Sequence, residues 1–301
     1  MYRGWYQVAY ERELGPELTP AAVARTPLVV VRTATGLRAI DAACPHRGAH
    51  LGHGGRLDGD AIVCPFHGHR VALDAVGDGG FCAREHRTLA VGGLVFALLG
   101  ADQDRGFAAH LAAMDRTRYF VPGFTLRVRA PAELVVENGF DHTHFHTVHG
   151  ILNEPAFALR ESLGGEFAVE GVFEIPPSPW QTGAAEASLR VPYVARAFSP
   201  GIVVSEMGGP NPYAVITCAT PGPEGDCAIR LSLAVPAAAD GRAPGQDLCR
   251  YLLDRSRAGL AKDQLIWENL VPGAPSRLTP ADAVIVAFRA FCRGLTDGET
   301  P

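Results

Sequence analysis

Two short segments that contain cysteine and histidine constrain this chain more than any other feature. The first reads Cys44-Pro-His46-Arg-Gly-Ala-His and the second Cys64-Pro-Phe-His67-Gly. Each segment therefore offers one thiolate and one imidazole. Two thiolates can hold one iron of a [2Fe–2S] cluster while two imidazoles hold the other, and this raises the reduction potential above that of an all-cysteine cluster. The pattern predicts an electron-accepting iron–sulfur centre with the ligands Cys44, His46, Cys64 and His67.

A tetrahedral zinc site is the nearest alternative, because two cysteines and two histidines also suit zinc. In zinc fingers, however, the cysteines come together in sequence and so do the histidines. Here each segment contributes one residue of each kind, as a two-loop clamp on a cluster requires. Two unrelated Cys-Pro turns would not produce matching halves, so we favour the cluster.

A second concentration of histidines follows in the middle of the chain. The segment Asp141-His-Thr-His144-Phe-His-Thr-Val-His149-Gly150 carries four of the 11 histidines. On an ideal helix, Asp141 and His144 lie about 60° apart and share a face, whereas His144 and His149 lie about 140° apart. Both histidines can then bind one metal only if the helix loosens or ends between them, and Gly150 is suited to end it. The alternative is a buried polar helix whose histidines bond one another.

A non-haem iron site needs a carboxylate beside two histidines, so that other coordination positions stay open. Near the C-terminus, Leu260, Asp263 and Trp267 follow helical spacing, which predicts that Asp263 lies on the inward face of an amphipathic helix. An acid on that face needs a partner. Glu268 is the second choice, and the alternative is that Asp263 only begins or caps a surface turn.

Both arrays resemble those of the Rieske non-haem iron oxygenases. The two Cys-Pro segments are similar to the cluster loops of that family, and Asp141-x-x-His144-x-x-x-x-His149 is similar to its mononuclear iron motif. The resemblance implies a Rieske [2Fe–2S] cluster and a mononuclear Fe(II) bound by His144, His149 and Asp263. It also implies that Asp141 links the two metal centres, while His142 and His146 match no ligand position.

The resemblance extends to one subfamily and has one departure. Asp263 is followed three and four residues later by Ile266-Trp267, as in the 3-ketosteroid 9α-hydroxylases and cholesterol 7-desaturases, and residues 281–291 look like the tail of that subfamily. His69 departs from the pattern, because the family usually carries an aromatic residue there.

Asn138 precedes Asp141 by one helical turn. On this interpretation it lies near bound dioxygen and takes part in catalysis. A helix N-cap is an equally good interpretation, because asparagine is favoured at that position.

The chain divides into two predicted domains. Residues 1–100, which begin with a short lead-in, contain β-rich runs separated by Gly, Asp and Pro, and this predicts a small all-β domain. Residues 101–301 form the catalytic domain. For the overall fold the resemblance implies an α+β protein, whose catalytic domain has the helix-grip arrangement of START and Bet v 1 proteins, an antiparallel sheet wrapped about a long C-terminal helix.

Within the catalytic domain, the predicted elements begin with a helix over 101–118 and a strand over 119–137 that leads into the histidine helix. A helix over 245–270 closes the sheet. The remaining predicted strands are 166–175, 186–191, 202–207, 213–220 and 227–235.

Charge and cysteine content limit the partners and the compartment. The chain has 32 acidic and 27 basic residues and a net charge of −5, which disfavours nucleic acid as a partner. Its longest apolar run, 89–101, falls short of the roughly 20 residues of a membrane span, and we see no signal peptide. The other cysteines are scattered and odd in number, which is typical of reduced thiols in a cytoplasmic protein. They are Cys82, Cys218, Cys227, Cys249 and Cys292.

The sequence thus indicates the terminal oxygenase component of a Rieske non-haem iron oxygenase. A reductase or ferredoxin drawing on NAD(P)H would supply electrons, and O2 would be used to hydroxylate or desaturate an apolar, polycyclic or steroid-like substrate. A monooxygenase for small aromatics or natural products remains open, and so does a Rieske electron carrier fused to a lipid-binding domain. The family resemblance implies a homotrimer in which the cluster of one chain serves the iron of its neighbour.

Overall fold

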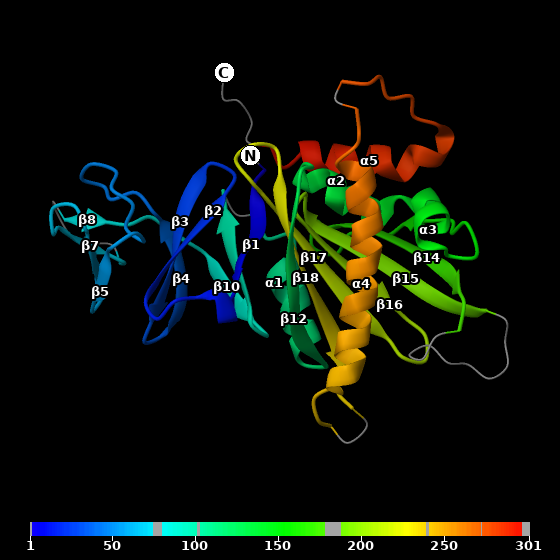
Figure 1. Ribbon diagram of the computed structural model, residues 1–301, viewed down its shortest axis with the longest axis horizontal. Helices are drawn as coiled ribbons and strands as arrows, with labels where there is room; N and C mark the ends of the chain where they lie inside the picture. Colours follow the sequence, from blue (N-terminus) through cyan, green and yellow to red (C-terminus); the bar gives the residue numbers. More distant parts are fainter. Residues whose placement is uncertain are drawn as a thin grey trace.

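The chain folds into two regions that lie one after the other along the longest axis of the molecule (Figure 1). The computed structural model describes residues 2–74, 80–100, 103–177, 188–238, 241–271 and 273–296. Small β-sheets occupy one end, and a large sheet with helices on its faces occupies the other. Within the described residues, no helix is both long and apolar enough to cross a membrane.

The N-terminal region consists of three small sheets with the strand orders β1-β11-β10, β2-β3-β4-β9 and β5-β6-β7-β8. All strand pairs are antiparallel except β7 with β8, so the predicted all-β domain is present with one parallel pair. The strands are β1 (Gly4–Tyr10), β2 (Leu18–Val23), β3 (Thr26–Thr33), β4 (Gly36–Asp41), β5 (Arg56–Asp58), β6 (Ala61–Val63), β7 (Arg70–Ala72), β8 (Phe81–Cys82), β9 (Glu85–His86), β10 (Thr88–Val91) and β11 (Leu94–Leu99).

The third of these sheets carries the two Cys-Pro segments. One segment lies between β4 and β5 and the other between β6 and β7. Cys44 and Cys64 are buried in an apolar cluster with Leu51, Ile62 and Val71. Burial of this cluster anchors the base of both loops, because the apolar side chains leave water together. The loop tips stay at the far end of the molecule.

The C-terminal region is built on one seven-stranded antiparallel sheet with the order β12-β18-β17-β16-β15-β14-β13. The first and last of its strands in sequence, β12 and β18, are neighbours in the sheet. The strands are β12 (Arg118–Val128), β13 (Ala158–Leu159), β14 (Phe167–Ile175), β15 (Leu189–Ser199), β16 (Ile202–Met207), β17 (Tyr213–Pro221) and β18 (Cys227–Pro236).

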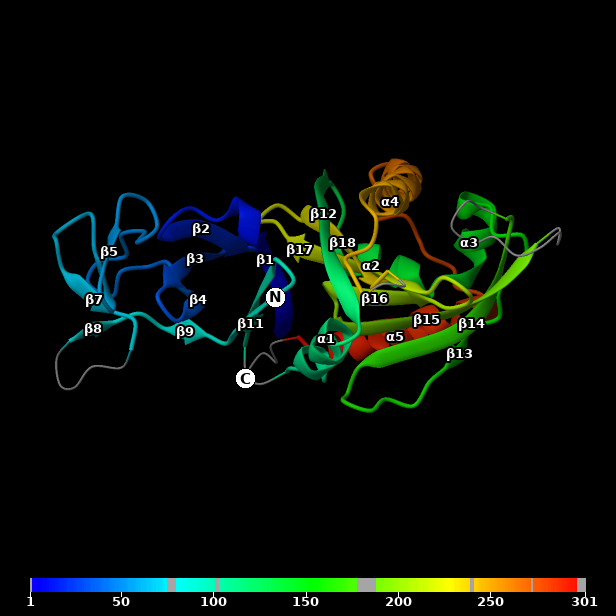
Figure 2. The same cartoon turned by 90° about the horizontal axis from the view of Figure 1, so that it is seen from below.

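The two faces of this sheet are covered by different elements, as the alternation along β17 shows. Ala214, Ile216 and Cys218 are buried against α1 (Phe107–Asp115) and the strands β1 and β11. Tyr213 and Val215 point to the opposite face and pack on the core beneath α4 (Gln246–Trp267). Figure 2 shows α4 and α1 on opposite sides of the sheet. The period of two in burial is what a strand between two layers requires.

The predicted α+β architecture with a long C-terminal helix is confirmed, since α4 spans all but the ends of the predicted 245–270 helix. One element was predicted wrongly. The strand over 119–137 ends at Val128, and α2 (Ala132–Glu137) follows it. Pro131 stands at the N-cap of α2, and Val135 and Val136 are buried in the core. Packing of this short helix on β17 and on α5 (Ala283–Arg293) overrides the strand preference of its valines.

Two other boundaries differ from prediction. Within the helix predicted over 101–118, the structure has only the helix α1, and residues 101 and 102 lie outside the described part. The strand predicted over 186–191 is β15, which runs from Leu189 to Ser199, and residues 178–187 also lie outside the described part. The other predicted strands of this sheet agree with β14, β16, β17 and β18.

Tyr10 of β1 joins the two regions. Its side chain is fully buried, and its hydroxyl donates to the carbonyl of Leu231 at 2.8 Å and lies 3.2 Å from that of Phe124. Ser232 donates its hydroxyl to the phenol oxygen of Tyr10 at 3.2 Å. Burial raises the pKa of Tyr10 to about 12. The phenol thus gives buried polar atoms of the C-terminal region a hydrogen-bond partner in β1.

We expect Tyr10→Phe to lower the free energy of unfolding by about 1–3 kcal/mol, because it leaves buried carbonyls and a hydroxyl without their partner. Urea denaturation followed by circular dichroism measures this change. Tyr119→Phe is the matched control: its hydroxyl also bonds a carbonyl, that of Gly241, but its side chain is 42% exposed. It should cost less than about 0.5 kcal/mol. Equal effects of the two substitutions would contradict the role of Tyr10.

Candidate active site

The two Cys-Pro loops have the same backbone hydrogen bonds. The N–H of Gly48 donates to the carbonyl of Cys44 at 2.8 Å, and the N–H of Gly68 donates to that of Cys64 at 3.0 Å. Both glycines have positive φ, 76° and 72°, a conformation that glycine adopts without strain. Each loop therefore turns back on itself after its cysteine and presents its ligands at the tip.

The surroundings of the two thiols, which affect their pKa values, suit two cysteines that bind one iron. Burial raises the pKa of Cys44, and the nearby Cys64 thiol raises it further. Burial also opposes ionisation of Cys64, but the backbone N–H groups of Phe66 and His67, together with Cys44, hold its pKa below the ordinary value. Backbone N–H groups that point at both sulfurs are suited to stabilise thiolates bound to iron.

The two predicted cluster histidines lie beside each other, with ring centroids of His46 and His67 4.8 Å apart. His69 fills the edge where the family carries an aromatic residue, and its ring contacts those of His46 at 4.5 Å and Phe81 at 5.1 Å. Phe81 of β8 therefore places an aromatic ring beside both histidines, which the sequence did not reveal. Phe66, at the loop tip, is 60% exposed.

The second array is built on α3 (His142–His149), and its ends are determined by its flanking residues. Asp141 is the N-cap, and its carboxylate accepts the backbone N–H of Thr143 at 3.2 Å and of His144 at 3.3 Å. Gly150, with φ 70°, ends the helix. An acidic N-cap satisfies unpaired N–H groups and opposes the helix dipole. Asp141 thus lies one residue before the helix and not within it, as the prediction of a shared helical face requires, but it still contacts His144 through its carboxylate and its carbonyl.

The imidazoles of His144 and His149 converge, with their Nε2 atoms 3.1 Å apart. The prediction that the helix must loosen or end between them is wrong, because α3 is continuous through His149. Although the two residues lie about 140° apart around the helix axis, their side chains are long enough to turn towards each other. The predicted end at Gly150 is confirmed.

Asp263 completes this group from α4. Its Oδ1 lies 3.1 Å from Nε2 of His149, and one ligand atom from each of the three residues lies within 4.8 Å of the others. The Asp263 side chain is buried, with 6% exposure, and Oδ1 makes no hydrogen bond within the described residues. A buried carboxylate oxygen without such a partner is costly. Two ligands at right angles and about 2.1 Å from one metal would lie about 3.0 Å apart, so the group fits a divalent metal ion.

The tautomer of His144 agrees with this fit. Its Nδ1 lies 2.6 Å from the backbone carbonyl of Asp141, which accepts an N–H there. The lone pair is then on Nε2, the atom that faces His149. Burial lowers the pKa of His144, and the neighbouring His149 lowers it as well, against the effect of the Asp141 carbonyl. The ring is therefore held neutral, as a metal ligand must be.

The remaining predicted residues make hydrogen bonds outside this group. Glu268 points elsewhere and accepts the backbone N–H of Arg129 at 3.0 Å. Asn138 is not a helix N-cap; it follows α2 and begins a short 3₁₀ turn, and its side-chain oxygen accepts the indole N–H of Trp267 at 3.3 Å. His142 and His146 bond the carbonyls of Ala281 and Ile151, at 3.1 and 2.7 Å.

An aromatic wall that the ligand motifs do not indicate stands behind α3. Phe145, next to His144 in sequence, contacts Phe173 at 4.8 Å and Tyr193 at 5.6 Å between ring centroids. Phe157 stacks on Tyr193 at 5.4 Å. Three of these rings come from β14, β15 and the segment before β13, so only the fold brings them to the metal site. They make its inner side apolar.

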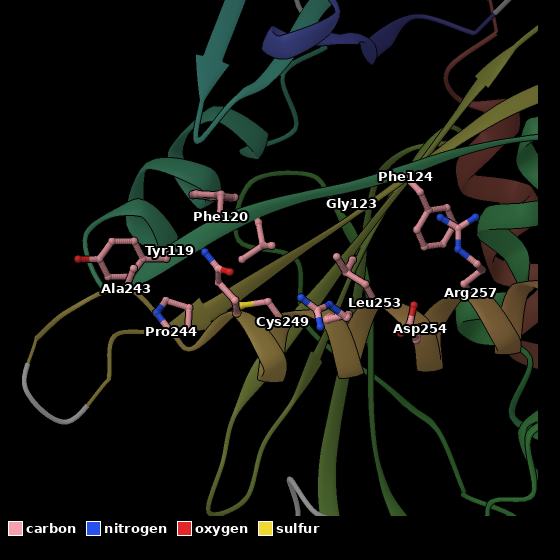
Figure 3. Close-up of a pocket in the computed structure, with 13 residues that line it drawn as sticks. Tyr119, Phe120, Gly123, Phe124, Ala243, Pro244, Cys249, Leu253, Asp254 and Arg257 are labelled. Carbon is pink, nitrogen blue, oxygen red and sulfur yellow. The ribbon is translucent and has the colours of Figure 1, made fainter.

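An open groove of about 500 Å³ lies on another part of α4 (Figure 3). Tyr119, Phe124, Leu253 and Arg257 are among its lining residues, and the Arg257 guanidinium stacks over the Phe124 ring at 3.9 Å. This groove runs along the contact between β12 and α4. It does not include the three converging residues, because α3 approaches α4 from its other side (Figure 1).

The two arrays lie at opposite ends of one chain. Strands β5, β7 and β8, which flank the Cys-Pro loops, are at one end of the long axis, and α3 is at the other, in both views (Figures 1 and 2). Electrons cannot take a short path between two sites so arranged within a single chain.

Comparisons with known proteins agree with this geometry. A model of the Rieske [2Fe-2S] domain matches residues 4–79, and a model of the 3-ketosteroid 9α-hydroxylase C-terminal domain matches residues 107–293. Aminopyrrolnitrin oxygenase PrnD of Pseudomonas fluorescens is 24% identical over 97% of this chain and 91% of its own length. Cholesterol 7-desaturase nvd of Bombyx mori is 48% identical, but over only 21% of this chain and 15% of its own length.

Solved structures show the same fold. NdmA of Pseudomonas putida CBB5 has a TM-score of 0.73 with 18% identity, over 97% of this chain and 89% of that one. Dicamba monooxygenase bound to dicamba has a TM-score of 0.69 with 19% identity, over 97% and 96%. Since the 3-ketosteroid 9α-hydroxylase model covers more than half of the chain and a Rieske domain precedes it, this protein belongs to the Rieske non-haem iron oxygenases, as an oxygenase component with a Rieske [2Fe–2S] cluster and a mononuclear iron.

Proposed function

We propose that this oxygenase hydroxylates or desaturates an apolar polycyclic molecule, with electrons from NAD(P)H delivered by a reductase or ferredoxin. The observation that carries the proposal is the convergence of His144, His149 and Asp263 beside an aromatic wall. Iron held by these three residues would supply the activation of O2 and the oxidation of the substrate. Two histidines and one carboxylate leave coordination positions open for both.

The residues around the triad have distinct tasks. The Asp141 carbonyl holds His144 in the tautomer that presents Nε2. Phe145 and Tyr193 keep water from the inner side of the site. Trp267 holds the Asn138 amide by a hydrogen bond. We propose that this amide lies at the edge of the site, beside the position that O2 would take. Each of these groups is positioned by a helix or a strand, so the site is preorganised.

Electron delivery is proposed to cross between chains. The cluster loops and the triad occupy opposite ends of the molecule (Figure 1), so a neighbouring copy must bring its cluster to the iron. Asp141 uses Oδ1 for its bonds to Thr143 and His144, and within the described residues no bond engages Oδ2. That oxygen is free to accept a cluster histidine of the neighbour. A closed ring, most simply a homotrimer, would give every iron site a cluster from a neighbouring chain. We further propose that the chain consists of two domains, 1–100 and 101–301, and that it functions in the cytoplasm.

The substrate class has one competing proposal. Aminopyrrolnitrin oxygenase matches nearly the whole chain, whereas cholesterol 7-desaturase matches about a fifth of it. This favours a natural-product monooxygenase as the second candidate. The match of residues 107–293 to the ketosteroid hydroxylase domain keeps the polycyclic substrate first.

We expect His144→Ala to lower the iron content from about three to about two per chain while the EPR signal of the reduced cluster persists, because the triad loses a ligand and the cluster does not. Metal analysis and EPR after dithionite reduction measure both. His146→Ala is the control, since its ring bonds the Ile151 carbonyl and should leave iron at about three. Unchanged iron in His144→Ala would overturn the triad.

Separate replacement of Asp263 in α4 and of Glu268 at its C-cap shows which acid binds the mononuclear iron. Asp263→Ala should lose the mononuclear iron, because its buried carboxylate faces His149. Glu268→Ala should retain it, because that side chain bonds the backbone of Arg129. Loss of iron in the second variant alone would assign the ligand to Glu268.

Asp141→Asn should keep its cap and its iron but slow electron transfer from cluster to iron by about 10- to 100-fold, the usual effect of an outer hydrogen-bonding partner. Single-turnover oxidation of the reduced cluster in the presence of O2 and substrate measures the rate. A rate equal to that of the wild type would remove Asp141 from the electron path.

A further inference from the structure

Helix α5 contacts the segment that leads to Asp141 from two adjacent positions. Arg289 donates two hydrogen bonds to the Glu137 carboxylate, from Nε at 2.6 Å and from Nη2 at 2.7 Å. The ring of Phe288, the preceding residue of α5, stacks on that of Phe140 with 5.0 Å between centroids. Glu137 ends α2, and Phe140 ends the short 3₁₀ turn that follows it. α5 therefore holds the residue before this turn and the last residue of the turn, directly before Asp141.

The residue after Asp141 is held by the segment that leads into α5. A 3₁₀ turn, Pro280–Asp282, comes directly before this helix. The carbonyl of Ala281 in this turn lies 3.1 Å from Nε2 of His142 and accepts its N–H. α5 and its lead-in thus contact the chain on both sides of Asp141.

The position of Asp141 determines the orientation of a metal ligand. Its carbonyl accepts the Nδ1–H of His144 at 2.6 Å, and its carboxylate accepts the backbone N–H of the same residue at 3.3 Å. A shift of the turn before Asp141 would move both acceptors together. It would then rotate the His144 ring and turn its Nε2 away from His149, which lies 3.1 Å away. Hydrogen-bonding partners outside the ligand sphere act on a metal site in this way.

The middle of the turn is held by the core of the catalytic region. Tyr193 donates its hydroxyl to the carbonyl of Gly139 at 2.9 Å, and Trp267 donates its indole N–H to the Asn138 side chain at 3.3 Å. Both aromatic side chains are buried, whereas the Arg289 side chain is 42% exposed. An ion pair of such exposure contributes little to stability, but its forked geometry fixes direction. It is therefore the contact of the turn that can be removed without opening the core.

We propose that Arg289 is a positioning residue of the mononuclear metal site, which acts through Glu137 to hold the Asp141 carbonyl where it orients His144. This inference rests on the proposed function, in which His144 binds iron, and adds to that site a residue of α5. Arg289 lies 152 residues from its partner in sequence and touches none of the three ligands through a hydrogen bond or ion pair within the described residues. Loss of the pair should weaken iron binding more than it weakens the fold.

Competition for ferrous iron tests this role. The fully metallated protein is equilibrated anaerobically with a ferrous chelator of known affinity, and the EPR signal of the reduced cluster confirms that only the mononuclear iron is removed. We expect Arg289→Gln to weaken binding of that iron about 10-fold, the lower end of the range for residues outside the ligand sphere, because it acts through one carbonyl. Arg289→Lys keeps the charge but not the fork and should show a smaller loss. Wild-type affinity in Arg289→Gln would overturn the proposal.

Arg196→Gln is the matched control for a merely structural effect. Arg196 pairs with Glu206, and its side chain is only 19% exposed. Its neighbour on β15, Ala195, lies in the core beneath α4, so Arg196 points to the other face of the sheet. This variant should lower the urea midpoint at least as much as Arg289→Gln does and leave the iron affinity unchanged. Equal losses of iron affinity in the two variants would reduce Arg289 to a structural role.

A double-mutant cycle tests whether Arg289 acts through Glu137. Glu137→Gln should weaken iron binding to a similar degree, and the variant with both substitutions should lose no more than either single variant, because the same contact is removed once. Additive losses would show that the two residues act separately and would contradict the proposed path. His144→Ala tests the proposed function itself. If it loses the mononuclear iron and Arg289→Gln does not, only the positioning role fails; if it retains that iron, the ligand assignment fails.

Discussion

The contact between a buried carboxylate on α4 and an imidazole on α3 is the interaction on which the site depends. Asp263 is almost fully buried, and an ionised carboxylate in such a position is stable only with a cation or donors. The His144 imidazole does not donate to it, because that ring gives its N–H to a carbonyl and is held neutral by burial, whereas Nε2 of His149 lies 3.1 Å from it. The arrangement is costly for a metal-free protein and favourable for one that binds iron.

The fold meets this requirement with elements that serve other purposes as well. α4 packs on β12 and β18 as well as on α3, and the sheet contacts fix its inward face. α3 is fixed by its caps, Asp141 and Gly150. Asp141 thereby combines three tasks: its carboxylate begins the helix, its carbonyl orients a metal ligand, and we propose that its free oxygen accepts the neighbour's cluster histidine. Because one residue connects these tasks, the metal site and the proposed electron path are positioned together.

Sequence reasoning succeeded where the information is local and failed where it is not. The cluster loops and the histidine helix are short segments whose ligands and turn residues stand together, so their spacing indicated them. The helix α2 was missed because its valines favour a strand, and only packing against β17 and α5 decides otherwise. The loosening of the helix that was expected between His144 and His149 does not occur, since ideal angles describe the backbone and long side chains can converge from different faces.

The sequence by itself determined the kinds of metal ligand, the order of the two domains and the family, because cysteines, histidines and glycines at close spacing carry that information without tertiary contacts. Tertiary structure decided that Asp263 joins the triad and Glu268 does not, because α3 meets α4 at Asp263, whereas Glu268 caps that helix and bonds the backbone of Arg129. It also decided that Phe81 of β8 packs against His46 and that Asp263 of α4 faces His149. These pairs are distant in sequence, and sheet register and helix packing alone bring them together.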